Sequence, residues 1–109
     1  MIERIQGGIN ALNAIDPNGF IFLLDSTDRS FIYKSSESPM AIESIISLDK
    51  EEGIESLAQK HPYIIENTRH FCAISRLLPH TFFGFFVLLE RTTSSRISQV
   101  REFFEKLKL

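Results

Sequence analysis

The sequence holds few of the residues that mark chemically specialised chains. Cys72 is its one cysteine, and tryptophan is absent. A single cysteine excludes an intramolecular disulfide and a four-cysteine zinc site, and it favours a reducing compartment. We therefore expect a cytoplasmic protein.

Neither basic nor acidic residues are in large excess. Twelve basic and fourteen acidic residues give a net charge of −2, whereas proteins that bind nucleic acid or anionic membranes usually carry a basic patch. No apolar run approaches the roughly 20 residues of a membrane-spanning helix, and Glu3 and Arg4 interrupt the amino-terminal apolar residues. We expect a soluble chain with no nucleic-acid partner and no direct membrane insertion.

Catalytic and cofactor-binding patterns are also lacking. His61, His70, His80 and Cys72 are the only soft metal ligands. His70 and Cys72 would lie on one side of a strand, but two ligands do not complete a metal site. Gly7-Gly8 falls inside a helical pattern and does not form a phosphate-binding loop. We expect no catalytic residue, metal or cofactor, and hence a protein that is not an enzyme.

Two continuous apolar segments dominate what is present. Between Thr81 and Glu90 stand eight uncharged and mostly bulky residues, which is the length of one strand, and Phe20–Leu24 is a second such run. A strand with one wet face would alternate apolar with polar residues. Both segments therefore predict central strands that are covered on both faces.

Hydrophobic periodicity and turn residues predict the remaining elements. The first helix carries an apolar stripe at spacings of three and four, formed by Ile2, Ile5, Ile9, Leu12 and Ile15. In chain order we expect a helix at 2–14, strands at 20–24 and 31–34, a helical segment at 39–60, strands at 63–67, 71–78 and 82–89, and a helix capped by Ser94 or Ser95 that ends near 107. The chain is expected to form one domain, 1–109.

The middle helical segment admits two interpretations. Ser38 can cap it, with Pro39 in the first turn. If the helix is continuous, one face carries Ile42, Ile45, Ile46, Gly53 and Leu57, but Asp49 lies on that face as well. Alternatively, Asp49 and Glu52 form a pair like a capping box, and a second short helix starts at Lys50.

The element order helix-strand-strand-helix-strand-strand-strand-helix predicts an α/β (α+β) fold, a three-layer α/β/α arrangement with a five-stranded antiparallel sheet. Through Gly19–Asp25, the meander Tyr63–Leu89 and the closing helix from Ser94, it resembles the roadblock/LC7 family, whose profilin-like fold is related to longin domains. The resemblance implies that the first and last helices cover one sheet face and the middle helix the other, with the first and fifth strands central. Unlike many members, this chain lacks a glycine in the turn around Asp28-Arg29.

A second resemblance concerns PAS sensor domains. The segment Leu12–Asp25 followed by Phe31-Ile-Tyr33 looks like the opening of such a domain, although Lys34 replaces the asparagine usual after the second strand. This alternative implies a sensory domain that encloses a small ligand and relays a signal by dimerisation. The roughly 25 residues between the second and third strands are short for a ligand-enclosing segment.

The roadblock/LC7 resemblance implies a non-enzymatic dimeric scaffold or regulator. Members usually dimerise through the middle helix and the third-strand edge, as a homodimer or as a heterodimer with a related domain, and present a two-subunit surface to a Ras-like small GTPase or to a motor or trafficking complex. The residues expected at this dimer or partner interface are Ile42, Ile45, Ile46, Gly53, Leu57, Tyr63 and Ile65.

Overall fold

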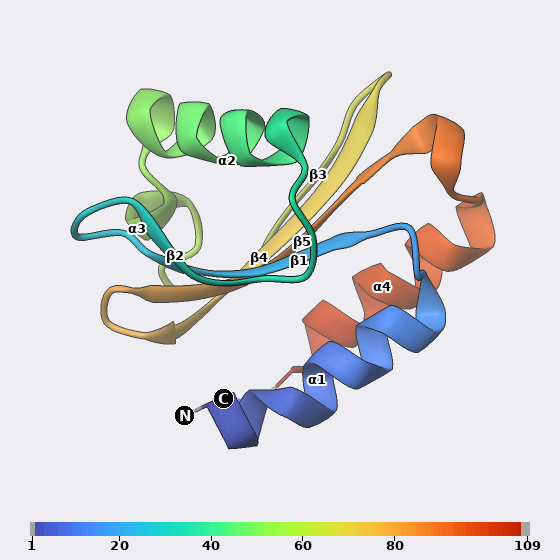
Figure 1. The fold of residues 1–109 in the computed structure, drawn as a ribbon, viewed down its shortest axis with the longest axis horizontal. Coiled ribbons are helices and arrows are strands. Elements are labelled where there is room, and N and C mark those ends of the chain that lie inside the picture. The colour runs from blue at the N-terminus through green and yellow to red at the C-terminus, as the bar shows by residue number, and fades with distance from the viewer. Residues whose placement is uncertain (1, 108–109) are drawn as a thin grey trace.

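The computed structural model describes residues 2–107, with side chains from Ile5 onward, and it has three layers (Figure 1). Its elements are α1 (Ile2–Ile15), β1 (Phe20–Asp25), β2 (Ser30–Lys34), α2 (Pro39–Glu52), α3 (Ile54–Leu57), β3 (Tyr63–Glu66), β4 (His70–Leu78), β5 (Thr81–Leu88), the 3₁₀-helix η1 (Leu89–Arg91) and α4 (Ser94–Lys106). The order and type of the elements agree with the expected α+β arrangement.

The five strands form one antiparallel sheet in the order β2-β1-β5-β4-β3. β5 is in the middle with β1 beside it, as the two apolar runs predict. Phe20–Leu24 and Thr81–Val87 are buried along their whole length. Because side chains alternate between the two faces of a strand, both faces of the sheet must be covered.

Helices α1 and α4 cover one face, while α2 and α3 cover the other (Figure 1). The core under α1 and α4 contains Ile5, Ile9, Leu12, Ile21, Leu23, Phe71, Ala73, Phe83, Phe85, Val87, Ile97, Val100 and Phe104. The core under α2 and α3 contains Phe20, Phe22, Leu24, Ala41, Ile45, Ile54, Ala58, Cys72, Ile74, Phe82 and Phe86. The expected stripe of the first helix is confirmed for the buried Ile5, Ile9 and Leu12, while the side chain of Ile2 lies outside the described residues.

The middle helical segment is divided into two helices, and the division falls at Gly53. α2 begins at Pro39 after the cap Ser38, as expected, and runs through Asp49 to Glu52, so a new helix starting at Lys50 is wrong and so is one unbroken helix. Gly53 has φ 80°, a left-handed conformation that glycine adopts without steric cost. Asp49 nevertheless stabilises the second helix, because its Oδ1 accepts a hydrogen bond from the N–H of Ile54 at 3.0 Å.

Smaller corrections concern two other element ends. α4 is capped by Thr93, whose hydroxyl accepts from the N–H of Arg96 at 3.2 Å, and not by Ser94 or Ser95, which already lie in the helix. β5 ends at Leu88, one residue earlier than expected, because a 3₁₀-helix follows.

Arg29 takes a left-handed conformation, φ 55°, in the β1–β2 turn. Its Nε lies 3.0 Å from Oδ2 of Asp49. This ion pair connects the β1–β2 turn to α2, so it holds the middle helix over that end of the sheet. Among residues 2–107 we find no helix with the length and apolar character needed to cross a bilayer.

Candidate functional site: an open edge of the sheet

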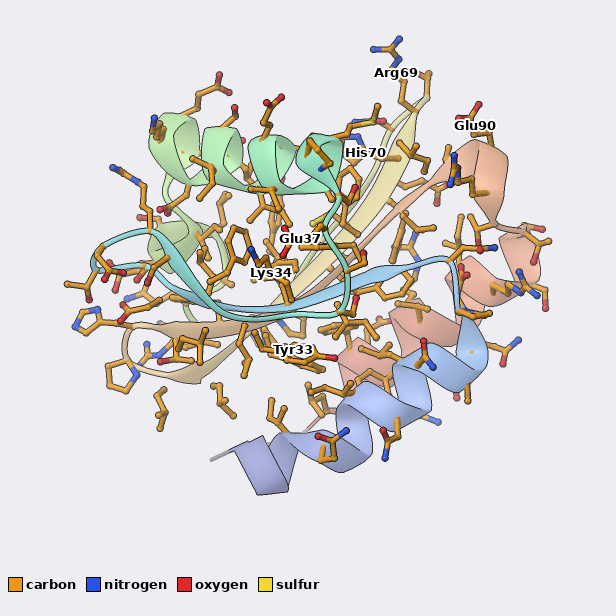
Figure 2. All side chains as sticks on the ribbon, viewed as in Figure 1. Tyr33, Lys34, Glu37, Arg69, His70 and Glu90 are labelled. Carbon is orange, nitrogen blue, oxygen red and sulfur yellow. The ribbon has the colours of Figure 1, made fainter. Side chains whose placement is uncertain are left out.

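The two edges of the sheet differ in what they expose. Each edge strand ends in one charged residue, and on β2 this is Lys34, which pairs with Glu37 at 3.2 Å (Figure 2). The β1–β2 pairing also has a register shift between Leu23 and Leu24, and such a bulge opposes pairing of the edge with another chain. The β3 edge has the half-buried apolar residues Tyr63–Ile65 and no charge before Glu66. β3 is therefore the edge better suited to accept another strand.

The backbone of β3 directs hydrogen-bonding groups away from the sheet. The N–H of Asn67 donates to the carbonyl of His70 at 3.0 Å and closes the β3–β4 turn. Hydrogen-bonding groups alternate in direction along an antiparallel strand, and β3 pairs with β4 without a register shift. Ile64 and Glu66 consequently point their N–H and C=O groups outward, where the described residues include no further strand.

The side chains of β3 alternate between the two helical layers. Tyr63 and Ile65 pack against the core under α2, and Ile64 packs against the core under α1 and α4. Glu66 lies on this second side, with Oε1 3.2 Å from Nη2 of Arg101 in α4. The edge strand is thus apolar on the α2 side and carries one exposed ion pair on the other.

A groove of about 300 Å³ separates α2 from the β3–β4 hairpin. α2 contributes Ser44, Ile45, Ser47, Leu48, Glu51 and Glu52, and the sheet contributes Tyr63, Ile65, Asn67, His70, Cys72 and Phe86. The hairpin ends at Arg69, which points away from the rest of the molecule (Figure 2). The groove and the open strand form one surface, which we call the β3 surface.

Burial shifts the pKa values of three groups in the groove, Tyr63, His70 and Cys72, toward their uncharged forms. Burial raises the pKa of the Tyr63 hydroxyl, and the nearby Glu52 carboxylate and Cys72 raise it further. Burial lowers the pKa of His70, whose ring lies 4.8 Å from that of Phe86. Burial also raises the pKa of the Cys72 thiol to about 12. The thiol is therefore not an activated nucleophile, because nucleophilic attack needs the thiolate.

The interface residues expected from the sequence are only partly brought together. Tyr63 and Ile65 do line the groove. Ile45 lines it as well, but this side chain is 1% exposed and belongs to the core under α2, so it offers almost no surface to a partner. Ile42 and Ile46 are half-buried and do not line the groove. At 100° per residue they lie on the other flank of α2.

The other two expected residues lie at the end of the middle segment. Gly53 forms the break between α2 and α3, and the half-buried Leu57 lies on α3 beside a separate hollow that also touches Tyr63. Neither lines the groove. Sequence reasoning missed Leu48, Ser44 and Ser47, whose spacing of three and four marks the groove-facing flank, because the isoleucine stripe was the stronger signal.

The histidines are dispersed. His80 contacts Glu55 of α3 through Nδ1, His70 stacks on Phe86, and His61 lies in the loop before β3. Within residues 2–107 no group of three His, Cys, Asp or Glu side chains lies close enough together to hold a metal ion.

Comparison with known proteins adds a similarity of fold. No protein-family model matches the chain, and no curated protein matches it by sequence. Among solved structures, Myxococcus xanthus MglB is similar, with a TM-score of 0.45 and 10% sequence identity over 85% of this chain and 88% of that chain. Similarity at this level assigns neither a family nor a function.

Proposed function

We propose that the protein is a small interaction module that pairs with a second copy of itself, or with a related chain, along β3. The observation that carries this proposal is the β3 edge: its outward N–H and C=O groups lack a partner strand in the described structure, and its apolar side chains are only half-buried. Strand addition to such an edge supplies main-chain hydrogen bonds, while flanking side chains supply specificity. The pair would present a two-subunit surface to a further partner.

The chemistry of β3 favours one register for self-pairing. In an antiparallel pair about a two-fold axis, outward residues must face outward residues, so the axis lies at Ile64, Ile65 or Glu66. An axis at Ile64 would place Glu66 opposite Pro62, which has no N–H to donate. An axis at Glu66 would place two carboxylates directly opposite each other, which is destabilising.

The axis at Ile65 avoids both problems. It pairs Ile64 of each chain with Glu66 of the other, and each pair exchanges both of its N–H···O bonds. The two Ile65 side chains then meet on the α2 side, next to the groove. A four-residue strand alone buries less than the roughly 1,200 Å² of a stable interface, so Leu48 and the adjacent flank of α2 are included in the proposed surface, whereas Ile42 and Ile46 are not.

Disulfide trapping tests this pairing. In a Cys72→Ala background, Ile65→Cys should form a covalent dimer on mild oxidation, because residues at a non-hydrogen-bonded antiparallel position have Cα atoms about 4.5 Å apart, within disulfide range. Ile64→Cys, one residue away, should not, since its symmetry mate would lie at roughly 8–9 Å. Ile32→Cys on the exposed β2 edge is the second control. Sedimentation that finds a monomer at every micromolar concentration would remove the proposal.

The further partner is taken from the roadblock/LC7 resemblance, which implies a Ras-like small GTPase or a motor or trafficking complex. Titration of a purified Ras-like GTPase, loaded with GDP or with a GTP analogue, tests this step by calorimetry. Binding is expected to depend on the nucleotide and to be lost in Ile65→Lys, which places a charge on the dimer axis. Binding that Ile65→Lys leaves unchanged would contradict a two-subunit surface.

The PAS alternative gains no support from the α2 side of the sheet. A sensory domain of that kind needs an enclosed ligand pocket. Apart from the open groove beside β3, the space between the sheet and the helices α2 and α3 is filled by fully buried side chains, among them Phe22, Phe82 and Ile54.

A further inference from the structure

A second stretch of backbone without a partner strand lies in β4, one strand inward from the β3 edge. β3 pairs with β4 only over Phe71–Ile74, whereas β4 continues to Leu78 with β5 alone beside it in the described structure. Cys72 and Ile74 direct their backbone groups toward β3, so by alternation Arg76 does the same. Its N–H and C=O therefore point to the space beside β4 that β3 does not reach.

A cleft of about 230 Å³ lies in this space. The loop between α3 and β3 contributes Gln59, Lys60 and His61, and β4 contributes Ser75 and Arg76. The polar side chains that line it are three potential cations, a hydroxyl and an amide, and the rest of the lining is the apolar Ala58, Pro62 and Leu107.

The ionisable side chains that line this cleft are all basic. No acidic residue lines it, and none of Lys60, His61 and Arg76 forms an ion pair within 4.0 Å among residues 2–107. Most acidic residues of α2 and α3 lie elsewhere, on the groove or facing His80. A concentration of positive charge in a chain of net charge −2 attracts anions locally.

We propose that this cleft binds an acidic, extended peptide segment of a partner protein, which adds to β4 as a short strand. The carboxylates of the segment would lie against Lys60 and Arg76, with Ser75 and Gln59 as further hydrogen-bond donors. A peptide fits better than a small anion, because an added strand pairs with both the outward N–H and the outward carbonyl of Arg76 while its side chains reach the cations. This site is separate from the β3 surface and goes beyond the proposed function.

The test is an NMR titration of the ¹⁵N-labelled chain with an acetylated, amidated peptide that alternates valine with glutamate. Amide shifts are expected at Gln59–His61 and Ser75–Arg76. The double reversal Lys60→Glu/Arg76→Glu should weaken binding about tenfold or more, because two charge pairs become repulsive. The matched control Arg91→Glu/Arg96→Glu makes the same change of net charge near the start of α4 and should leave the affinity unchanged.

Three results would overturn the proposal. One is the absence of shifts at millimolar peptide. Another is equal weakening by the control variant, which would indicate non-specific attraction. The third is inorganic phosphate that shifts the same amides while the peptide does not, which would indicate a small-anion site. A peptide with lysine in place of glutamate should not bind, and circular dichroism confirms that each variant remains folded.

Discussion

At the scale of single residues, Gly84 shows how closely the aromatic core is packed. It lies in β5 directly opposite Phe22 of β1, and a Cβ built on it would come within 2.1 Å of the Phe22 ring. Phe22 is fully buried, so its ring has no free space into which it can move. The absence of a side chain at position 84 is therefore a requirement of the neighbouring strand.

We expect Gly84→Ala to destabilise the protein by about 1–3 kcal/mol, the usual cost of overpacking a core. Phe22→Leu removes the clashing ring atoms, so the double variant should lose less stability than the two single variants lose together. Gly7→Ala is the matched control: nothing lies within 4 Å of its Cβ position in α1, and alanine favours a helix by about 1 kcal/mol. Urea unfolding measures all four; additive costs at positions 22 and 84 would contradict the assigned contact.

At the scale of elements, the α2–α3 break depends on Asp49. This side chain is 7% exposed, and its two oxygens serve different elements. Oδ1 accepts from the N–H of Ile54 at the start of α3, and Oδ2 pairs with Arg29 of the β1–β2 turn. One residue thereby joins α2 both to the adjacent α3 and to the β1–β2 turn, which lies 20 residues earlier in the chain.

Replacing Asp49 by alanine should cost about 1–3 kcal/mol, because the buried N–H of Ile54 loses its acceptor. Asp49→Asn should cost less, since the amide oxygen still accepts that hydrogen bond and only the charge opposite Arg29 is lost. Arg29 is half-exposed, so its own replacement by alanine should cost least. Chemical denaturation ranks the three variants, and an equal cost for alanine and asparagine would argue against the cap.

At the scale of the whole molecule, the two cores are opposite faces of one sheet. Residues of β1, β4 and β5 alternate between them, so neither helical layer can separate without exposing buried strand residues. Cys72 lies in β4 within the core under α2, and it is the chain's only thiol.

The Cys72 thiol should report opening of the whole structure. With its pKa raised to about 12 by burial, almost no thiolate exists at pH 8, and reaction requires exposure. We expect its modification by a chromogenic disulfide reagent to follow the global unfolding rate over a urea series. Ile32→Cys on the exposed β2 edge should react at once. Modification of Cys72 much faster than unfolding would instead indicate that β3 detaches locally.

Much of the candidate site required the structure. Tyr63 and Ile65 were expected at the interface because the roadblock/LC7 resemblance implies the third-strand edge, and both line the groove. For the isoleucines of α2 the structure adds what the pattern lacks, because a stripe of period 3.6 identifies one apolar face but not which neighbour each residue meets. Ile45 is buried in the core and also lines the groove, beside the half-buried Leu48, which the stripe did not single out.

The sequence alone determined the central strands and the three-layer order, because hydrophobic runs and periodicity record how much water each element can meet. Tertiary packing alone decided that α2 breaks at Gly53, which flank of that helix faces β3, and that Lys60 and Arg76, sixteen positions apart in the sequence, line one cleft. Local sequence patterns predict whether a residue is buried, whereas contacts between distant segments depend on how whole elements pack together.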